Sequence, residues 1–210
     1  MAVFEDLSNG VITGSVAKVT ELTKKAVDDG VAPTDIINQG LITGMSVVGA
    51  RFKAGEMFVP EVLMAARAMN AGLDIVKPLI TEGDIPSTGK VIIGTVKGDL
   101  HDIGKNLVGM MMESGGFNVV NLGVDIAPEK FAAAVKEHKP QVVALSALLT
   151  TTMLAMKDTI EVLKEEGLRG SVKVIIGGAP VTQQFADEIG ADGYAPDAAS
   201  ATDLAKKLLS

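Results

Sequence analysis

The chain has 210 residues, of which 47% are hydrophobic and 21% are charged, as is usual for folded globular domains. Nineteen Lys and Arg against 26 Asp and Glu leave a net charge of -7 without a basic cluster, which disfavours nucleic acid as a partner. The absence of Cys excludes disulfides, thiolate zinc sites and cysteine nucleophiles. No apolar run is long enough to cross a membrane and the first ten residues lack a secretion signal, so we expect no membrane partner and a cytoplasmic location.

Helical periodicity dominates the first part of the chain, where apolar residues recur at intervals of three and four. The predicted helices run from about Val3 to Ser8, Ser15 to Gly30, Pro33 to Phe52 and Pro60 to Ile80. They predict a helical bundle domain over residues 1–84. A polar segment from Thr81 to Gly89, interrupted by Pro and Gly, is the predicted linker.

After Lys90 short apolar runs alternate with helical stretches, which predicts βαβ units and a parallel sheet. The predicted strands are Val91 to Val96, Asn118 to Leu122, Gln141 to Leu148, Val172 to Ile176 and Gly193 to Ala195. The predicted helices are Ile103 to Ser114, Pro128 to His138, Met153 to Glu166, Thr182 to Ile189 and Ser200 to Leu209. The α/β pattern favours a doubly wound, Rossmann-like sheet of the flavodoxin type over residues 90–210, in which ligands bind beyond the carboxyl ends of the strands.

The loop after the first predicted strand contains Asp99, His101 and Gly104. An Asp two residues before a His can turn back and accept from one imidazole nitrogen, which leaves the other nitrogen free to ligate a metal. An Asp–His pair that only stabilises the turn explains the same residues equally well. Gly104 opens the next helix without a side chain that would obstruct a ligand. Lys97 and Lys105 flank the loop and could meet amides or a phosphate of a ligand.

Two further loops follow the third and fourth predicted strands. One runs from Ser146 to Thr152 and the other contains Gly177 and Gly178. A single Ser at a strand end usually caps a helix, and a Gly pair usually forms a turn. All three loops, however, leave the same edge of the predicted sheet, where they combine a His, a hydroxyl-bearing wall and a slot free of side chains.

Three spaced motifs carry a resemblance to a known family. In chain order, Asp99-x-His101-x-x-Gly104, Ser146-x-Leu148 and Gly177-Gly178 resemble the cobalamin-binding signature of methionine synthase and of the corrinoid proteins of methanogenic and acetogenic methyl transfer. Gly44-Met45 and the segment Gly55 to Glu61 resemble the helical cap of the same family. The resemblance covers about residues 15–200.

The resemblance implies that cobalamin binds with its dimethylbenzimidazole base off the cobalt, and that His101 replaces this base as the lower axial ligand. Asp99 is then expected to hold the second nitrogen of His101. Thr152, where methionine synthase has a serine, keeps the hydroxyl of the same relay. The residues implied to line the slot for the nucleotide tail are Gly104, Ser146, Leu148, Gly177 and Gly178.

The implied function is that of a methyl carrier, with no catalytic residue of its own. Such a protein carries a methyl group on cobalt from a substrate-specific methyltransferase, with a methylamine as the first choice of donor and glycine betaine, methanol or methoxyaromatics as others. It passes the group to a second methyltransferase that uses tetrahydrofolate or coenzyme M, and a reductive activation protein is a further expected partner.

Two other functions share these motifs. A cobalamin-sensing regulator would normally carry a DNA-binding or signalling module, and the cobalamin-binding subunit of an isomerase usually lacks the helical cap.

Overall fold

The computed structural model describes residues 2–80 and 88–210. The chain forms two compact units, an N-terminal unit of helices and a C-terminal unit built on a parallel sheet. Most of the linker predicted from Thr81 to Gly89, including residues 81–87, lies outside the described residues. Gly89 already belongs to the first strand.

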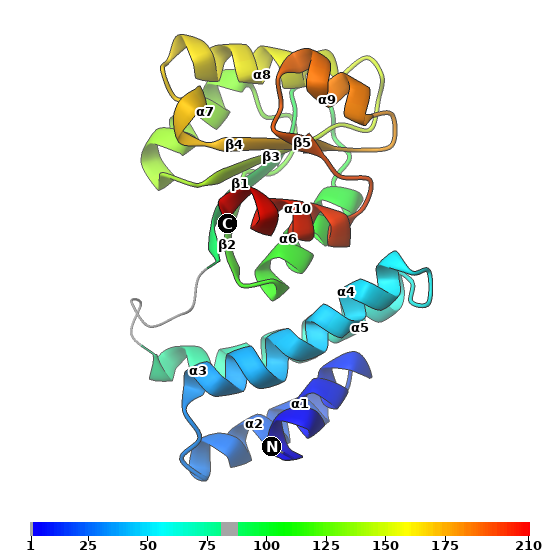
Figure 1. The fold of residues 1–210 in the computed structure, drawn as a ribbon, viewed down its shortest axis with the longest axis vertical. Coiled ribbons are helices and arrows are strands. Elements are labelled where there is room, and N and C mark those ends of the chain that lie inside the picture. Colours follow the sequence, from blue (N-terminus) through cyan, green and yellow to red (C-terminus); the bar gives the residue numbers. More distant parts are fainter. Residues whose placement is uncertain (1, 81–87) are drawn as a thin grey trace. The chain divides into compact units, whose positions relative to one another are not determined.

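The predicted helical character of the N-terminal unit is confirmed (Figure 1). Its elements are α1 (Ala2–Ile12), α2 (Val16–Asp28), α3 (Pro33–Asp35), η1 (Ile36–Ile42), α4 (Thr43–Lys53), α5 (Val59–Val76) and η2 (Lys77–Leu79). The fully buried side chains at the centre of this unit come from each of the longer helices and include Leu7, Val19, Leu41, Val48, Val62 and Val76. Burial of this apolar stripe supplies most of the stability of such short helices.

The first helix is longer than the sequence predicts. Helix α1 continues past Ser8 to Ile12 because Leu7 and Val11, four residues apart, are both fully buried on one face. Gly10 weakens a helix by propensity, but a Cβ at this position would lie 2.8 Å from the Cγ2 atom of Val19. Close packing therefore overrides the low helix propensity of the segment.

The predicted helix from Pro33 to Phe52 is present, but it is not α-helical throughout. Residues Ile36–Ile42 form a π-helical stretch. The side-chain hydroxyl of Thr43, the first residue of α4, donates to the Asn38 carbonyl at 2.9 Å. In α4, a Cβ at Gly44 would lie 2.8 Å from both the carbonyl oxygen of Ser8 and the Cβ of Val11. Gly44 thus allows α4 to approach α1 closely.

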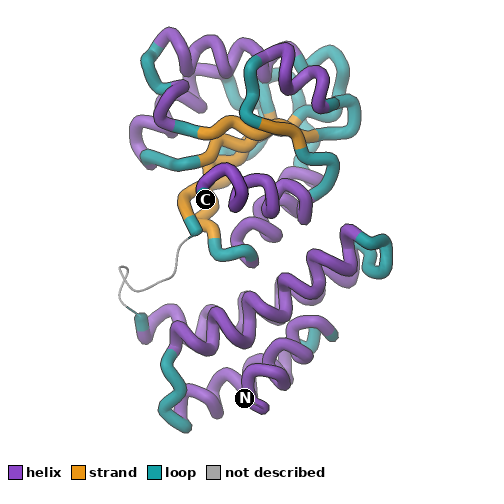
Figure 2. Tube along the Cα trace, viewed as in Figure 1, coloured by secondary structure: helices purple, strands orange, loops and turns teal. Residues whose placement is uncertain are grey.

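The strands of the C-terminal unit form one sheet, drawn in orange in Figure 2. The five strands are all parallel, in the order β2-β1-β3-β4-β5. Their bounds are β1 (Gly89–Thr95), β2 (Phe117–Asn121), β3 (Val142–Ser146), β4 (Lys173–Gly177) and β5 (Gly193–Tyr194). This is the flavodoxin-like order of a doubly wound sheet, so the predicted fold class is confirmed.

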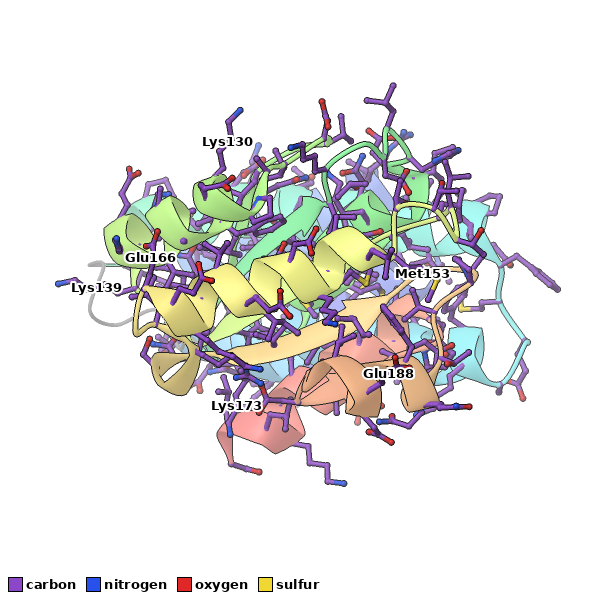
Figure 3. All side chains as sticks on the ribbon, turned by 90° about the horizontal axis from the view of Figure 1, so that it is seen from above. Lys130, Lys139, Met153, Glu166, Lys173 and Glu188 are labelled. Carbon is purple, nitrogen blue, oxygen red and sulfur yellow. The ribbon has the colours of Figure 1, made fainter. Side chains whose placement is uncertain are left out.

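Helices cover both faces of the sheet. The helices are α6 (Ile103–Ser114), α7 (Pro128–His138), α8 (Leu154–Glu165), α9 (Gln183–Ile189) and α10 (Ala198–Leu209), with a short η3 (Arg169–Ser171) before β4. Alternate strand residues face opposite sides, so Ile92 packs with α7, α8 and α9 while Val91 and Ile93 pack with α6 and α10. Figure 3 looks onto the first of these faces, with Lys130 on α7 and Met153 and Glu166 at the two ends of α8.

In the part of the chain that the structure describes, none of the helices combines the length and the apolar character that a membrane span needs.

Candidate functional site

Three strand ends stand side by side at one edge of the sheet. The strand register pairs Thr95 of β1 with Ser146 of β3, and Ser146 in turn with Gly177 of β4. The loops that follow these residues therefore leave the sheet at the same level. The point between β1 and β3 is where the strand order reverses, which is the usual ligand site in doubly wound sheets.

The loop after β1 places Asp99 against His101. The Nδ1 atom of His101 lies 2.7 Å from Oδ1 of Asp99, and the same oxygen accepts from the backbone N–H of His101 at 3.0 Å. A carboxylate can only accept, so Nδ1 donates to Asp99, and in the neutral ring Nε2 then keeps a lone pair. The His101 side chain is 51% exposed while the Asp99 side chain is 0% exposed. The imidazole is thus available to a ligand and is fixed from behind.

The second oxygen of Asp99 is held by the loop after β3. It accepts from the backbone N–H of Leu148 at 2.7 Å, from the N–H of Leu149 at 3.3 Å and from the hydroxyl of Thr152 at 2.7 Å. Burial alone raises the pKa of the Asp99 carboxyl, but the hydrogen bonds from Leu148, Thr152 and His101 outweigh burial and hold the pKa well below its ordinary value. Asp99 therefore stays charged. The relay implied by the resemblance needs hydrogen bonds from Thr152 and from His101 to Asp99, and both are present.

These contacts also explain why β3 ends earlier than predicted. The sequence predicts a strand from Gln141 to Leu148, whereas β3 covers Val142–Ser146. Ala147 still donates its N–H to the Gly177 carbonyl at 3.2 Å, but the N–H of Leu148 donates to Asp99 instead of a neighbouring strand. The departure of the chain from the sheet at this point creates the wall of the site.

The glycines of the site differ in the space that a side chain would find at each position. Gly178 has a φ of 137°, and a Cβ there would lie 1.8 Å from the Ala147 carbonyl oxygen, so the protein's own packing excludes any larger residue. A Cβ at Gly177 would lie 3.1 Å from the Ala195 carbonyl oxygen, whereas a Cβ at Gly104 would meet no atom within 4 Å. Gly104 therefore borders open space beside the histidine loop.

A set of apolar side chains surrounds the histidine loop. The exposed large hydrophobic residues of the described C-terminal unit all lie in this loop, in the first turn of α6, or in the segment from the end of β3 to the start of α8: Leu100, Ile103, Leu148, Leu149 and Leu154. Leu100 is 72% exposed and Ile103 is 81% exposed, which is unusual for such residues in one small region. A broad, largely apolar ligand with an imidazole-binding centre fits this set of side chains.

The sequence did not indicate two residues that support the histidine loop, Thr95 and Asp125, or the pairing of Lys105 with Asn121. Buried Thr95 donates its hydroxyl to the His101 carbonyl at 2.8 Å, and Asp125 accepts the N–H of Gly98 at 2.7 Å. Lys105, which we expected to meet a ligand, is 3% exposed and donates to Asn121 at 2.6 Å. Burial lowers the pKa of Lys105, and nearby Asp102 partly opposes this effect. Only the position of Thr95 at the end of a predicted strand hinted at such a role.

Comparison with known proteins places both units in one family. A family model described as a B12 binding domain matches residues 89–203, and a second model with the same description matches residues 3–77. The chain belongs to the B12-binding corrinoid proteins. Cobalamin is its cofactor, and the half-exposed imidazole and the surrounding apolar side chains fit a flat macrocycle with a metal ion at its centre.

Relatives and solved structures agree with this membership. A corrinoid protein of Desulfitobacterium hafniense (strain Y51) is 47% identical, with 100% of this chain and 98% of the relative covered. Dimethylamine corrinoid protein 1 of Methanosarcina acetivorans is 47% identical, with 98% and 96% covered. The crystal structure of the methanol:cobalamin methyltransferase complex from Methanosarcina barkeri matches with a TM-score of 0.89 at 33% identity, over 99% of this chain and 80% of that one.

Proposed function

We propose that this corrinoid protein carries a methyl group between two methyltransferases, with a methylamine as the original donor. The observation that carries the proposal is the half-exposed imidazole of His101, held by a buried and charged carboxylate and surrounded by exposed apolar side chains. When bound, cobalamin supplies the cobalt ion to which the methyl group is attached during transfer.

His101 is the residue that would ligate cobalt. Its Nε2 atom has no hydrogen-bond partner within residues 2–80 and 88–210, while Nδ1 is bound to Asp99. The hydrogen bond to Asp99 keeps the ring in one orientation and one tautomer whether or not Nε2 is ligated. Leu148 and Thr152 in turn keep the Asp99 carboxylate in place. These contacts would hold Nε2 of His101 in one place for the cobalt ion.

The slot for the nucleotide tail would lie beside the end of β3. Half-buried Ser146 stands at this strand end, between Thr95 and Gly177 in the register. Gly178, which the Ala147 carbonyl confines, keeps the neighbouring backbone free of side chains. With Gly104 and Leu148, these residues form the set that we propose for the cofactor, and His101 is the proposed metal ligand.

The choice of a methylamine donor rests on relatives. The matching Methanosarcina proteins include ones named for dimethylamine, monomethylamine and trimethylamine, at 41–47% identity. We propose a substrate-specific methyltransferase and an acceptor methyltransferase using tetrahydrofolate or coenzyme M as partners, together with a reductive activation protein. We also propose a cytoplasmic location.

A donor panel tests the proposal. The holoprotein is offered monomethylamine, dimethylamine, trimethylamine, glycine betaine and methanol, each with a methyltransferase specific for it, and methylation of the cofactor is followed by absorption spectroscopy. We expect methylation with one of the methylamines and its loss in His101→Ala. Methylation only with methanol or glycine betaine would contradict the donor class, and no methylation with any donor would contradict the carrier function.

A further inference from the structure

Asp125 has an unusual backbone conformation close to the histidine loop in space. It lies between β2 and α7 and has a φ of 54°. Among the described residues, Asp125 and Lys139 are the ones that combine a side chain with a positive φ, and Lys139 simply ends α7. This conformation costs an L residue about 1 kcal/mol, so surrounding contacts must fix it.

These contacts are hydrogen bonds between Asp125 and two residues of the histidine loop, Gly98 and Asp99. Oδ1 of Asp125 accepts the N–H of Gly98 at 2.7 Å, and the N–H of Asp125 donates to the carbonyl oxygen of Asp99 at 3.0 Å. Gly98 is itself in the left-handed region, with a φ of 82°. Asp125 thus binds the histidine loop on both sides of the Gly98–Asp99 peptide.

The rest of the same segment is tied to β1. Gly123 accepts the N–H of Thr95 at 3.0 Å, and Ile126 donates its N–H to the Thr95 carbonyl at 3.0 Å. Thr95 in turn donates its hydroxyl to the His101 carbonyl. The segment from 123 to 126 is therefore fixed to β1 by backbone hydrogen bonds. Within this segment, Asp125 makes the hydrogen bonds to the start of the histidine loop.

We propose that Asp125 is a positioning residue for His101 that acts through the backbone of Gly98 and Asp99. Asp125 fixes the Asp99 backbone, while Leu148 and Thr152 fix the Asp99 carboxylate. Together these contacts leave Oδ1 of Asp99 where it meets Nδ1 of His101. The proposal rests on the proposed function, because it takes His101 to be the cobalt ligand.

The functional consequence is a histidine loop that is formed before cobalamin arrives. A preformed loop avoids the loss of conformational freedom that would otherwise weaken binding. Residues that orient metal ligands typically change affinity by about 10–100-fold when they are replaced. Because Asp125 acts on His101 only through the backbone of Gly98 and Asp99, we expect its replacement to lower cobalamin affinity by about 10-fold, at the lower end of this range.

Three variants distinguish the loss of the hydrogen-bond acceptor of Asp125 from a change in its backbone conformation. Asp125→Gly allows the left-handed backbone but removes the acceptor for the N–H of Gly98. Asp125→Asn keeps an acceptor oxygen, and Asn also adopts the left-handed backbone readily. Lys139→Gly makes the same kind of backbone change at the other positive-φ residue and serves as the matched control.

The measurements are amide hydrogen exchange at Gly98 in the cofactor-free protein, the cobalamin dissociation constant, and the histidine-ligated fraction of bound cob(II)alamin. In Asp125→Gly we expect exchange and the dissociation constant to rise about 10-fold, with a smaller ligated fraction and cooperative unfolding retained. Asp125→Asn and Lys139→Gly should behave as the wild type. Unchanged exchange and ligation in Asp125→Gly would overturn the inference alone, whereas absence of histidine ligation in the wild type would overturn the proposed function as well.

Discussion

In the C-terminal unit the buried charged side chains, Asp99 of the histidine loop and Lys105 of α6, each have a hydrogen-bond partner. The N-terminal unit contains a different case, since Thr23 of α2 is fully buried and its Oγ1 has no hydrogen-bond partner among the described residues. An unpaired buried hydroxyl costs about 1–3 kcal/mol, which a well-packed helical unit can tolerate. The buried charges of the C-terminal unit are thus paired, whereas a buried hydroxyl of the N-terminal unit is left without a partner among the described residues.

The largest expected effect is that of His101→Ala. Removing the imidazole deletes the proposed cobalt ligand and one hydrogen bond to the buried Asp99 carboxylate, which keeps its hydrogen bonds from Leu148 and Thr152. We expect the histidine-ligated absorption spectrum of bound methylcobalamin to disappear while the free energy of unfolding of the cofactor-free protein changes little. An identical base-on spectrum in the wild type and the variant would contradict the assignment of the ligand.

Asp99→Asn should have the next largest effect. An amide cannot accept from all of the donors that surround Asp99, so the orientation of His101 is lost in part. We expect cobalamin affinity to fall by about 10–100-fold, measured by titration of the cofactor-free protein. An affinity equal to that of the wild type would mean that the ring is oriented by other contacts.

The same variant tests the pH dependence of stability. Since the pKa of Asp99 in the folded protein lies below its ordinary value of 3.8, the unfolded chain takes up the proton first as the pH falls. The stability that Asp99 contributes is complete above the ordinary value and is lost progressively below it. Urea unfolding of the cofactor-free proteins should therefore show that the advantage of the wild type over Asp99→Asn shrinks as the pH falls below about 4. A constant difference across this range would contradict the charged state of Asp99.

Lys105 and Asn121 allow a comparison between removing a buried charge and removing its partner. Asn121→Leu leaves the ammonium of Lys105 without its acceptor and also removes the hydrogen bonds of Asn121 with Asn106 and Gly123, so we expect a loss of at least about 2 kcal/mol in the free energy of unfolding. Lys105→Met removes the charge itself and should change stability by less than about 1 kcal/mol. Lys130→Met, at an exposed position on α7, is the control for the change of residue type. Equal losses in the first two variants would contradict the expectation that an unpaired buried ammonium costs more than its removal.

The smallest effect is expected in the N-terminal unit. Thr23→Val keeps the shape of the side chain and removes the unpaired hydroxyl, so the protein should become more stable by about 1 kcal/mol. Urea unfolding measures this change, and cobalamin affinity serves as the control because it should not move. A loss of stability would show that the hydroxyl has a partner in solution.

The sequence predicts the elements and the contact between Asp99 and His101, because both depend on residues that are close along the chain. Apolar periods of 3.6 and runs of β-branched residues mark the helices and strands, and the spacing of Asp99 and His101 marks their hydrogen bond. The support of the loop depends on pairs that are distant in sequence, such as Gly98 with Asp125 and Lys105 with Asn121, which are 27 and 16 residues apart. The first pairing follows from the parallel register of β1 and β2 and the second from the packing of α6 against the sheet, and periodicity encodes neither. The π-helical stretch Ile36–Ile42 was missed because its apolar residues fit an ordinary helix equally well.

The most direct measurement is electron paramagnetic resonance of cob(II)alamin bound to protein in which histidine alone carries nitrogen-15. An axial nitrogen-14 splits the signal into triplets, whereas an axial nitrogen-15 splits it into doublets. If His101 is the axial ligand, the unlabelled holoprotein gives triplets, labelling converts them to doublets, and His101→Ala abolishes the doublets. Triplets that persist in the labelled protein would show that the dimethylbenzimidazole base remains on the cobalt, and would contradict the account.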